Sequence, residues 1–185
     1  MTPYKIAVFV GSLRKASYNL KVAKSLISLA PESLSLEIID IGDLPIYNED
    51  LEKEVPSQWK TLRNQIAAAD GVLFVTPEYN RSIPAVLKNA IDIGSRPKTD
   101  NKWNGKPGGI ISVSPGKLSA FGANHHLRQT LVPINVPVMA QPEAYIGEVM
   151  TLFDETGRLN NESTSDFLKM FLSKYSKWVI RNSDR

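Results

Sequence analysis

Short apolar runs alternate along this chain with longer stretches in which apolar residues recur every three to four positions. Runs such as YKIAVFV (4–10) and GVLFV (71–75) are rich in β-branched residues and lack polar positions, which is typical of strands buried on both faces of a parallel sheet. The pattern predicts five strands, at residues 4–10, 35–41, 71–75, 108–114 and 136–140.

The stretches that follow the strands have the period of an amphipathic helix. They predict five helices, at residues 17–29, 57–69, 83–94, about 121–132 and about 163–181. We expect the last helix to dock on the sheet through a face that comprises Phe167, Met170, Phe171, Lys174, Trp178 and Arg181. Regular alternation of strand and helix predicts a doubly wound α/β fold.

Composition narrows the class of protein. With 185 residues, 42% of them hydrophobic and 22% charged, the whole chain, 1–185, is expected to form one domain. No apolar run approaches the roughly 20 residues that span a bilayer, and the N-terminus lacks a signal-peptide pattern, so we expect a cytoplasmic protein. The net charge of +3 comes from scattered Lys and Arg residues, which favours a small anionic ligand and predicts neither a nucleic-acid nor a membrane partner.

The chain contains no cysteine. Disulfides, thiol redox chemistry and thiolate metal sites are therefore excluded, and any redox chemistry has to come from a bound organic cofactor.

Ligands of open α/β sheets bind beyond the carboxyl ends of the strands, where the strand order reverses. In a 2-1-3-4-5 order, strands one, three and four are neighbours. The loops that follow them, at residues 11–19, 76–84 and 114–122, would then converge on one crevice.

The first of these loops, GSLRKASYN, has the composition of a phosphate-binding turn at a helix N-terminus. Its candidate phosphate ligands are Ser12, Arg14, Ser17 and Asn19. A helix cap at Ser17 and a solvated charge at Arg14 are the alternative interpretation. Because Gly11 is the loop's single glycine, neither the dinucleotide-binding fingerprint nor a P-loop is present, and a terminal monophosphate fits better.

The second and third loops combine turn formers with an aromatic ring and small polar groups, which suits contact with a flat heteroaromatic ring. The candidates are Pro77, Glu78, Tyr79 and Asn80 in TPEYNRSIP, and Ser114 and Gly116 in SPGKLSAFG. Ordinary turns would serve the fold equally well at both places.

Taken together, GSLRKASYN, TPEYNRSIPAVLKNAID and SPGKLSAFGANHHLRQTL resemble the NAD(P)H-dependent FMN reductases, a flavodoxin-like family that includes quinone and chromate reductases. The resemblance implies a five-stranded parallel sheet of order 2-1-3-4-5 with helices on both faces. It also implies that the first loop holds the FMN phosphate, that the second borders the isoalloxazine ring, and that Ser114 and Gly116 close the other side. Family members often have Gly-Gly where this chain has Ser119-Ala120.

By the same resemblance, NAD(P)H would deliver a hydride through FMN to a quinone, an azo compound, a metal oxyanion or free flavin. The cofactor would carry the chemistry, so no catalytic side chain and no metal site are expected. A homodimer or homotetramer is implied as well. The alternative is a flavodoxin-type electron carrier that serves protein partners, although such carriers are strongly acidic and this chain is not.

A few other residues invite a functional interpretation. His125 and His126 are adjacent on a predicted helix and point about 100° apart, so they are not expected to share a ligand. Asp40 is expected to stabilise a turn. Trp59, Trp103 and Trp178 are expected to be packing groups.

Overall fold

The structure of the protein is a computed structural model that describes residues 2–183. Its strands are β1 (Tyr4–Val10), β2 (Leu34–Ile39), β3 (Gly71–Thr76), β4 (Gly108–Val113) and β5 (Ala144–Ile146). Its α-helices are α1 (Tyr18–Leu29), α2 (Ser57–Ala68), α3 (Ala85–Gly94), α4 (Phe121–Leu131) and α5 (Glu162–Asn182). Short 3₁₀ helices occupy η1 (Glu49–Lys53), η2 (Lys98–Asp100), η3 (Val132–Ile134) and η4 (Val149–Thr151).

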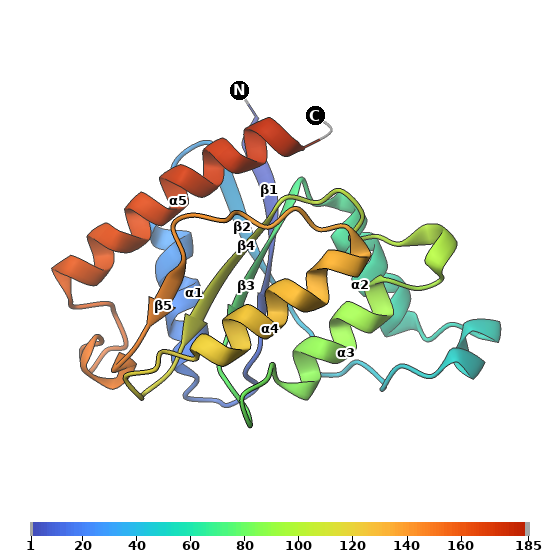
Figure 1. The fold of residues 1–185 in the computed structure, drawn as a ribbon, viewed down its shortest axis with the longest axis horizontal. Coiled ribbons are helices and arrows are strands. Elements are labelled where there is room, and N and C mark those ends of the chain that lie inside the picture. Colours follow the sequence, from blue (N-terminus) through green and yellow to red (C-terminus); the bar gives the residue numbers. More distant parts are fainter. Residues whose placement is uncertain (1, 184–185) are drawn as a thin grey trace.

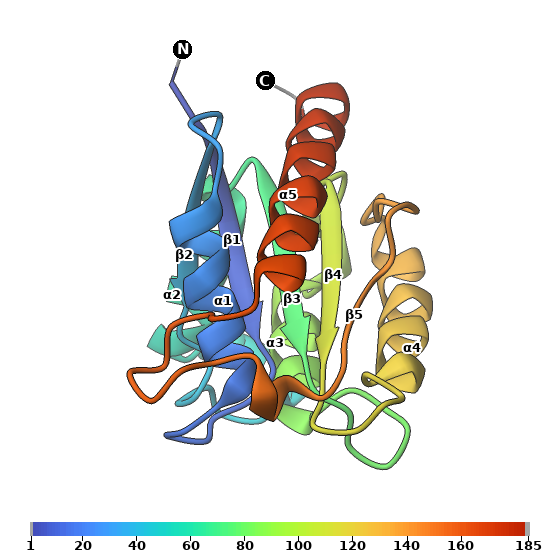
Figure 2. The same cartoon turned by 90° about the vertical axis from the view of Figure 1, so that its left-hand side faces the viewer.

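The strands form one parallel sheet in the order β2-β1-β3-β4-β5, which confirms the predicted doubly wound topology. Helices α1 and α5 cover one face of the sheet, and α2, α3 and α4 cover the other (Figures 1 and 2). Side chains of β1 alternate between the two cores: Ile6 and Val8 lie under α1 and α5, whereas Ala7 and Phe9 lie under α2 and α3. Burial on both faces explains the unbroken apolar runs.

The fifth strand was wrongly predicted. Residues 136–140 make only an isolated bridge, in which Gly108 pairs with Val138, and the strand itself is Ala144–Ile146. Pro137 lacks an N–H and so cannot donate to a ladder, although its carbonyl accepts from the Gly108 N–H at 3.0 Å. The chain leaves the sheet after this bridge and rejoins it at β5, beside Ile111–Val113 of β4.

The five predicted helices are confirmed to within two residues at each end, but the buried face of α5 differs from the prediction. Leu168, Phe171, Leu172, Tyr175 and Val179 are buried, whereas Met170 is 40% exposed and Lys174 lies in solvent. The Tyr175 hydroxyl donates to the Val72 carbonyl at 2.7 Å and lies 3.2 Å from that of Pro107. This anchor orients the whole helix on the sheet.

The tryptophans are packing groups, as predicted. Trp59 and Trp103 are fully buried, and each donates its indole N–H to a backbone carbonyl, of Pro45 and Ile91 respectively. Trp178 is half-buried against Pro137. Asp40 stabilises a turn by accepting from the Gly42 N–H at 2.9 Å.

Candidate functional site

The three loops selected from the sequence lie together at the carboxyl edge of the sheet, at the lower side of Figure 1. Gly11 is the point of closest approach between the first two loops. Its N–H donates to Val75, and a Cβ at this position would lie 3.1 Å from Pro77 Cδ and 3.3 Å from Thr76 Oγ1. Any larger residue would push the two loops apart.

The first loop forms a turn that is open to solvent on its outer side. The Ser17 N–H donates to the Arg14 carbonyl at 3.1 Å, and the Ser17 side chain caps α1 by accepting from the Leu20 N–H at 3.1 Å. Because the cap uses a lone pair of Ser17, the hydroxyl proton stays available to a ligand. The capping interpretation of Ser17 is therefore correct and is compatible with phosphate binding.

Unsatisfied polar groups in this loop match the needs of a phosphate. Within residues 2–183, the backbone N–H groups of residues 12–16 have no hydrogen-bond partner, and neither does Oδ1 of Asn19, which is buried. The free N–H groups can donate to an anion at this helix N-terminus. The Asn19 oxygen is an acceptor, so Asn19 could serve a phosphate only through its Nδ2 group. Arg14 is exposed next to these donors, and none of the described carboxylates pairs with it.

The second loop is a two-residue β-hairpin. Tyr79 and Ser82 exchange both backbone hydrogen bonds at 2.9 Å, and Asn80 and Arg81 between them have φ values of 51° and 64°. Two successive left-handed residues define a type I′ turn, which Asn suits and Arg does not. The hairpin exposes 53% of Tyr79 and places Arg81 at its tip.

Glu78 has a structural task in this loop. Its Oε2 accepts from the Ala123 N–H at 2.9 Å, which caps the N-terminus of α4, and its Oε1 pairs with Arg81 at 3.2 Å. Gly122 leaves room for the cap, since a Cβ there would lie 2.9 Å from Oε2. The Glu78 carboxylate is thus occupied by protein groups.

The third loop brings its two predicted residues to the same edge. The Ser114 hydroxyl donates to the Gly116 carbonyl at 3.0 Å, and the Ser114 backbone bridges Ile146 and Val149. Gly116 is exposed, and a Cβ there would meet nothing closer than the Ser114 hydroxyl at 3.9 Å. The fold itself therefore does not require a glycine at 116.

The Ser119-Ala120 pair adopts the conformation that two glycines would favour. Their φ values are 54° and 57°, both left-handed. The Ser112 hydroxyl holds the Ser119 carbonyl at 2.8 Å, and the Asn124 N–H donates to the Ala120 carbonyl at 3.1 Å. Surrounding bonds thus impose a strained backbone on residues with side chains.

Comparison with known proteins agrees with this geometry. The model of the NADPH-dependent FMN reductase family matches residues 4–151. A quinone reductase of Pseudomonas putida is 56% identical over 97% of this chain and 96% of its own, and a 2-hydroxy-1,4-benzoquinone reductase of Burkholderia is 46% identical over 95% and 96%. This chain belongs to the FMN reductase family. It is an oxidoreductase that uses FMN as its cofactor and NAD(P)H as its electron donor.

The fold of this FMN reductase is shared with a solved structure. The flavoenzyme NAD(P)H:(acceptor) oxidoreductase FerB of Paracoccus denitrificans superposes with a TM-score of 0.92 at 40% identity, covering 97% of this chain and 99% of that one. The sheet order and the helices on both faces are therefore flavodoxin-like, as the resemblance implied. Among the described helices of the FMN reductase, none is long and apolar enough to cross a membrane.

An aromatic cluster beside the third loop escaped the sequence analysis. Phe121 packs on His125 with ring centroids 4.3 Å apart, and both lie near Tyr145 of β5, whose hydroxyl is 3.0 Å from His125 Nε2. Partial burial and the neighbouring Glu143 raise the Tyr145 pKa to about 12, so the phenol stays protonated at neutral pH. The i, i+4 spacing of Phe121 and His125 was visible in the sequence, but their neighbour from β5 was not.

The two adjacent histidines point to different neighbours, as helix geometry predicts. His126 Nδ1 lies 2.8 Å from the Ser82 hydroxyl, on the side of the hairpin, whereas His125 faces Tyr145. Within the described part of the chain, no group of three or more His, Asp or Glu side chains is placed to hold a metal ion.

Proposed function

We propose that this FMN reductase is a quinone reductase whose cofactor binds against the three loops at the carboxyl edge of the sheet. Its high identity to the P. putida quinone reductase over nearly the whole of both chains supports this substrate class most directly. Azo compounds, metal oxyanions such as chromate, and free flavin are further candidate acceptors. When bound, FMN supplies two-electron redox chemistry, and the protein supplies binding, orientation and protection from side reactions.

The first loop is proposed to bind the FMN phosphate. The free N–H groups of residues 12–16 and the hydroxyls of Ser12 and Ser17 would donate to its oxygens, together with the side-chain amide of Asn19. Arg14 would add a charge-assisted bond from the solvent side. The neutral donors would satisfy the phosphate oxygens, and Arg14 would offset part of the negative charge.

The second and third loops are proposed to hold the flavin ring. Tyr79 and Asn80 are exposed on the hairpin and would border the ring with Pro77. Because its carboxylate caps α4, Glu78 would contribute through its backbone. Ser114 and Gly116 would close the opposite side, where the space beside Gly116 admits a ligand.

We also propose a homodimer or homotetramer in the cytoplasm, where NAD(P)H is supplied. The rim of the crevice exposes large apolar side chains, with 53% of Tyr79, 63% of Leu118 and 53% of Phe121 accessible. A second copy that covered this rim would wall in the flavin. Light scattering should give a mass that is a multiple of 20.5 kDa. Phe121→Glu should lower this mass. A wild-type protein that is monomeric at micromolar concentration would contradict the proposal.

The cofactor and the reaction can be tested on one preparation. Heat-released flavin should co-elute with FMN in chromatography, because the first loop suits a terminal monophosphate, and FAD alone would exclude the proposed phosphate site. Benzoquinone, an azo dye, chromate and free FMN are then offered as acceptors with NADH or NADPH. Fast quinone reduction is expected, whereas an FMN protein without NAD(P)H oxidation would be an electron carrier.

A further inference from the structure

A groove of about 520 Å³ lies beside α1, on the face of the sheet that α1 and α5 cover, and is called the α1 groove below. One wall is a stripe of α1 that comprises Lys21, Lys24, Ser25, Ser28 and Leu29, and the other consists of residues 157–159 and Ser165 of α5. Figure 2 shows the segment between β5 and α5 crossing in front of α1. The volume falls within the range of small-molecule sites, roughly 300–1,000 Å³.

The wall opposite α1 is a short hairpin, residues 153–159, with a well-fixed backbone. An antiparallel bridge joins its first and last residues, and the Asp154 carboxylate accepts from the Arg158 N–H at 3.0 Å. Gly157 has a φ of 81°, and a Cβ there would lie 3.6 Å from Lys21 Cε. The hairpin therefore packs directly on the Lys21 side chain and brings Arg158 to the α1 groove.

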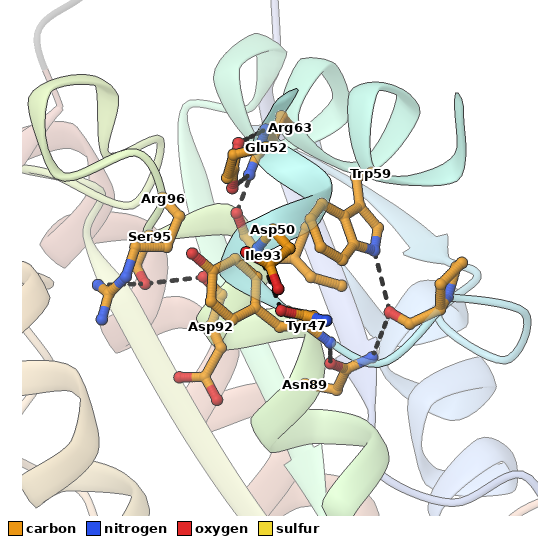
Figure 3. A network of polar contacts seen from close by, with 12 residues as sticks. Tyr47, Asp50, Glu52, Trp59, Arg63, Asn89, Asp92, Ile93, Ser95 and Arg96 are labelled. Atoms are coloured by element: carbon orange, nitrogen blue, oxygen red, sulfur yellow. Dashed lines mark hydrogen bonds and ion pairs between the residues drawn. The ribbon is translucent and has the colours of Figure 1, made fainter. Parts of the chain in front are cut away.

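Positive charge dominates the α1 groove. Its described lining contains the cations Lys21, Lys24 and Arg158 and no carboxylate. Within residues 2–183, none of these three side chains forms an ion pair. The cation Arg63 is arranged differently, because it is buried and paired with Glu52 at 2.6 Å (Figure 3). The α1 groove therefore presents cationic donors that are free to bind an anion.

The two lysines occupy positions that α1 itself does not favour. Lys21 lies in the first turn of the helix, where the helix dipole disfavours a cation, and Lys24 is a like charge three positions away. The Lys21 ammonium lies 5.4 Å from the ring centroid of Tyr18 and 5.5 Å from that of Phe153. These cation–π contacts fix its position and leave N–H donors for a ligand. A bound anion would offset the repulsion between the lysines.

We propose that the α1 groove binds an amphipathic organic anion, such as an aromatic carboxylate, whose charged group lies among Lys21, Lys24 and Arg158. Its apolar body would extend along α1 toward Leu29, which lies eight positions and therefore about 12 Å beyond Lys21. Leu29 and Leu159 supply apolar surface that a small inorganic anion would leave uncovered. The described lining includes no residue of the three loops, so this site is separate from the proposed flavin site.

Calorimetric titration of the holoenzyme tests this site with 2-naphthoate and its neutral analogue 2-naphthamide. The carboxylate should bind at least about tenfold more tightly than the amide, the value expected of one charge-assisted bond. The double variant K24Q/R158Q, which leaves the stacked Lys21 in place, should lose this difference. K174Q/K177Q, which removes the same charge from exposed positions of α5, should retain it.

A second variant tests the shape of the α1 groove independently of its charge. Ser28 is exposed on the α1 wall, so S28W should fill the groove and weaken binding of 2-naphthoate by at least about tenfold, the loss of one charge-assisted contact. Melting temperatures of both variants show whether they remain folded. Unchanged affinity in a folded S28W would overturn the proposal, as would tight binding of inorganic pyrophosphate that S28W does not reduce.

Steady-state kinetics separate the α1 groove from the flavin site. Saturating 2-naphthoate should leave the KM for benzoquinone unchanged, because the groove and the three loops share no lining residue. Competition with benzoquinone that persists in K24Q/R158Q would show that the ligand binds at the flavin instead, and would overturn the proposal. Equal affinities of 2-naphthoate and 2-naphthamide for the wild type would do the same. The titrations remain decisive even if the protein reduces no quinone.

Discussion

At the scale of single residues, the first loop separates groups that stabilise the fold from groups that are free to bind. Ser17 caps α1 and keeps a hydroxyl proton to donate, whereas the exposed Arg14 guanidinium and the backbone N–H groups of residues 12–16 have no partner within residues 2–183. The first loop thus presents several unpartnered donors at one helix N-terminus, an arrangement that suits an anion.

Arg14→Ala should weaken FMN binding much more than riboflavin binding, because riboflavin lacks the phosphate. The loss for FMN should be about ten- to a hundredfold, the range of a hydrogen bond between charged groups. Fluorescence titration of the apoprotein with both flavins measures this. Lys15→Ala, at the exposed position next to Arg14, is the matched control and should lose less. Equal losses for FMN and riboflavin in Arg14→Ala would remove Arg14 from the phosphate site.

Backbone strain at Ser119 and Ala120 predicts a contrast between two glycine substitutions. A left-handed residue with a side chain costs about 1–2 kcal/mol, and glycine removes this cost. Glycine also increases the entropy of the unfolded chain, which lowers stability by about 0.4–1 kcal/mol. Ser119→Gly should therefore raise the free energy of unfolding by about 0.5 kcal/mol. Ala120→Gly also loses a buried methyl group, worth about 0.8 kcal/mol, and should be close to neutral. Urea unfolding compares the two; destabilisation by Ser119→Gly would show that its bond to the Lys117 carbonyl outweighs the strain.

At the scale of elements, the hairpin and α4 depend on each other. Glu78 reaches from the hairpin to the Ala123 N–H, and His126 reaches from α4 back to Ser82. The ion pair of Glu78 with Arg81 adds little, because 72% of the Arg81 side chain is in solvent. The helix cap is therefore the interaction that fixes the second loop relative to the third.

Glu78→Ala should lower the free energy of unfolding by about 1 kcal/mol, the typical value of a lost helix cap. For a chain of this size, the melting temperature should fall by about 2–4 °C. Glu78→Gln, which keeps an acceptor but loses the charge beside the helix dipole, should lose less. Calorimetry of both variants checks this order, with exposed Glu32→Ala as the control. An Ala variant as stable as the wild type would mean that water or another group replaces the cap.

At the scale of the whole molecule, the three loops lie together at one edge of one sheet, and the flavin is proposed to bind there. The nicotinamide ring and the electron acceptor would then have to occupy the same space above the flavin in turn.

Ping-pong kinetics are therefore expected. Initial rates over a grid of NADPH and benzoquinone concentrations should give parallel double-reciprocal lines, and each substrate should inhibit at high concentration by binding the form of the enzyme that awaits the other. Intersecting lines would mean that both substrates are bound together, and would require a second acceptor site.

Local patterns determined most of the elements and the edge of the sheet at which the three candidate loops meet. Parallel strands buried on both faces have to be continuously apolar, so their runs are visible in the sequence, and polar loops that follow them have to meet at one edge. The strand order and the family were likewise expected from the three motifs. Ser17 at the start of α1 was predictable because a cap depends on residues only three positions away.

Only the tertiary structure decided features that depend on residues distant in the sequence. The α5 face follows from Tyr175, which fits against the sheet because Gly109 leaves space: a Cβ there would lie 3.1 Å from its ring. The apolar periodicity of the α5 sequence could not show that Tyr175 packs against Gly109. The expected fifth strand makes one bridge, at Val138, and β5 formed where the chain rejoins the Ile111–Val113 segment. Glu78 became a helix cap because the fold brings the hairpin beside the N-terminus of α4, a contact that no local pattern shows.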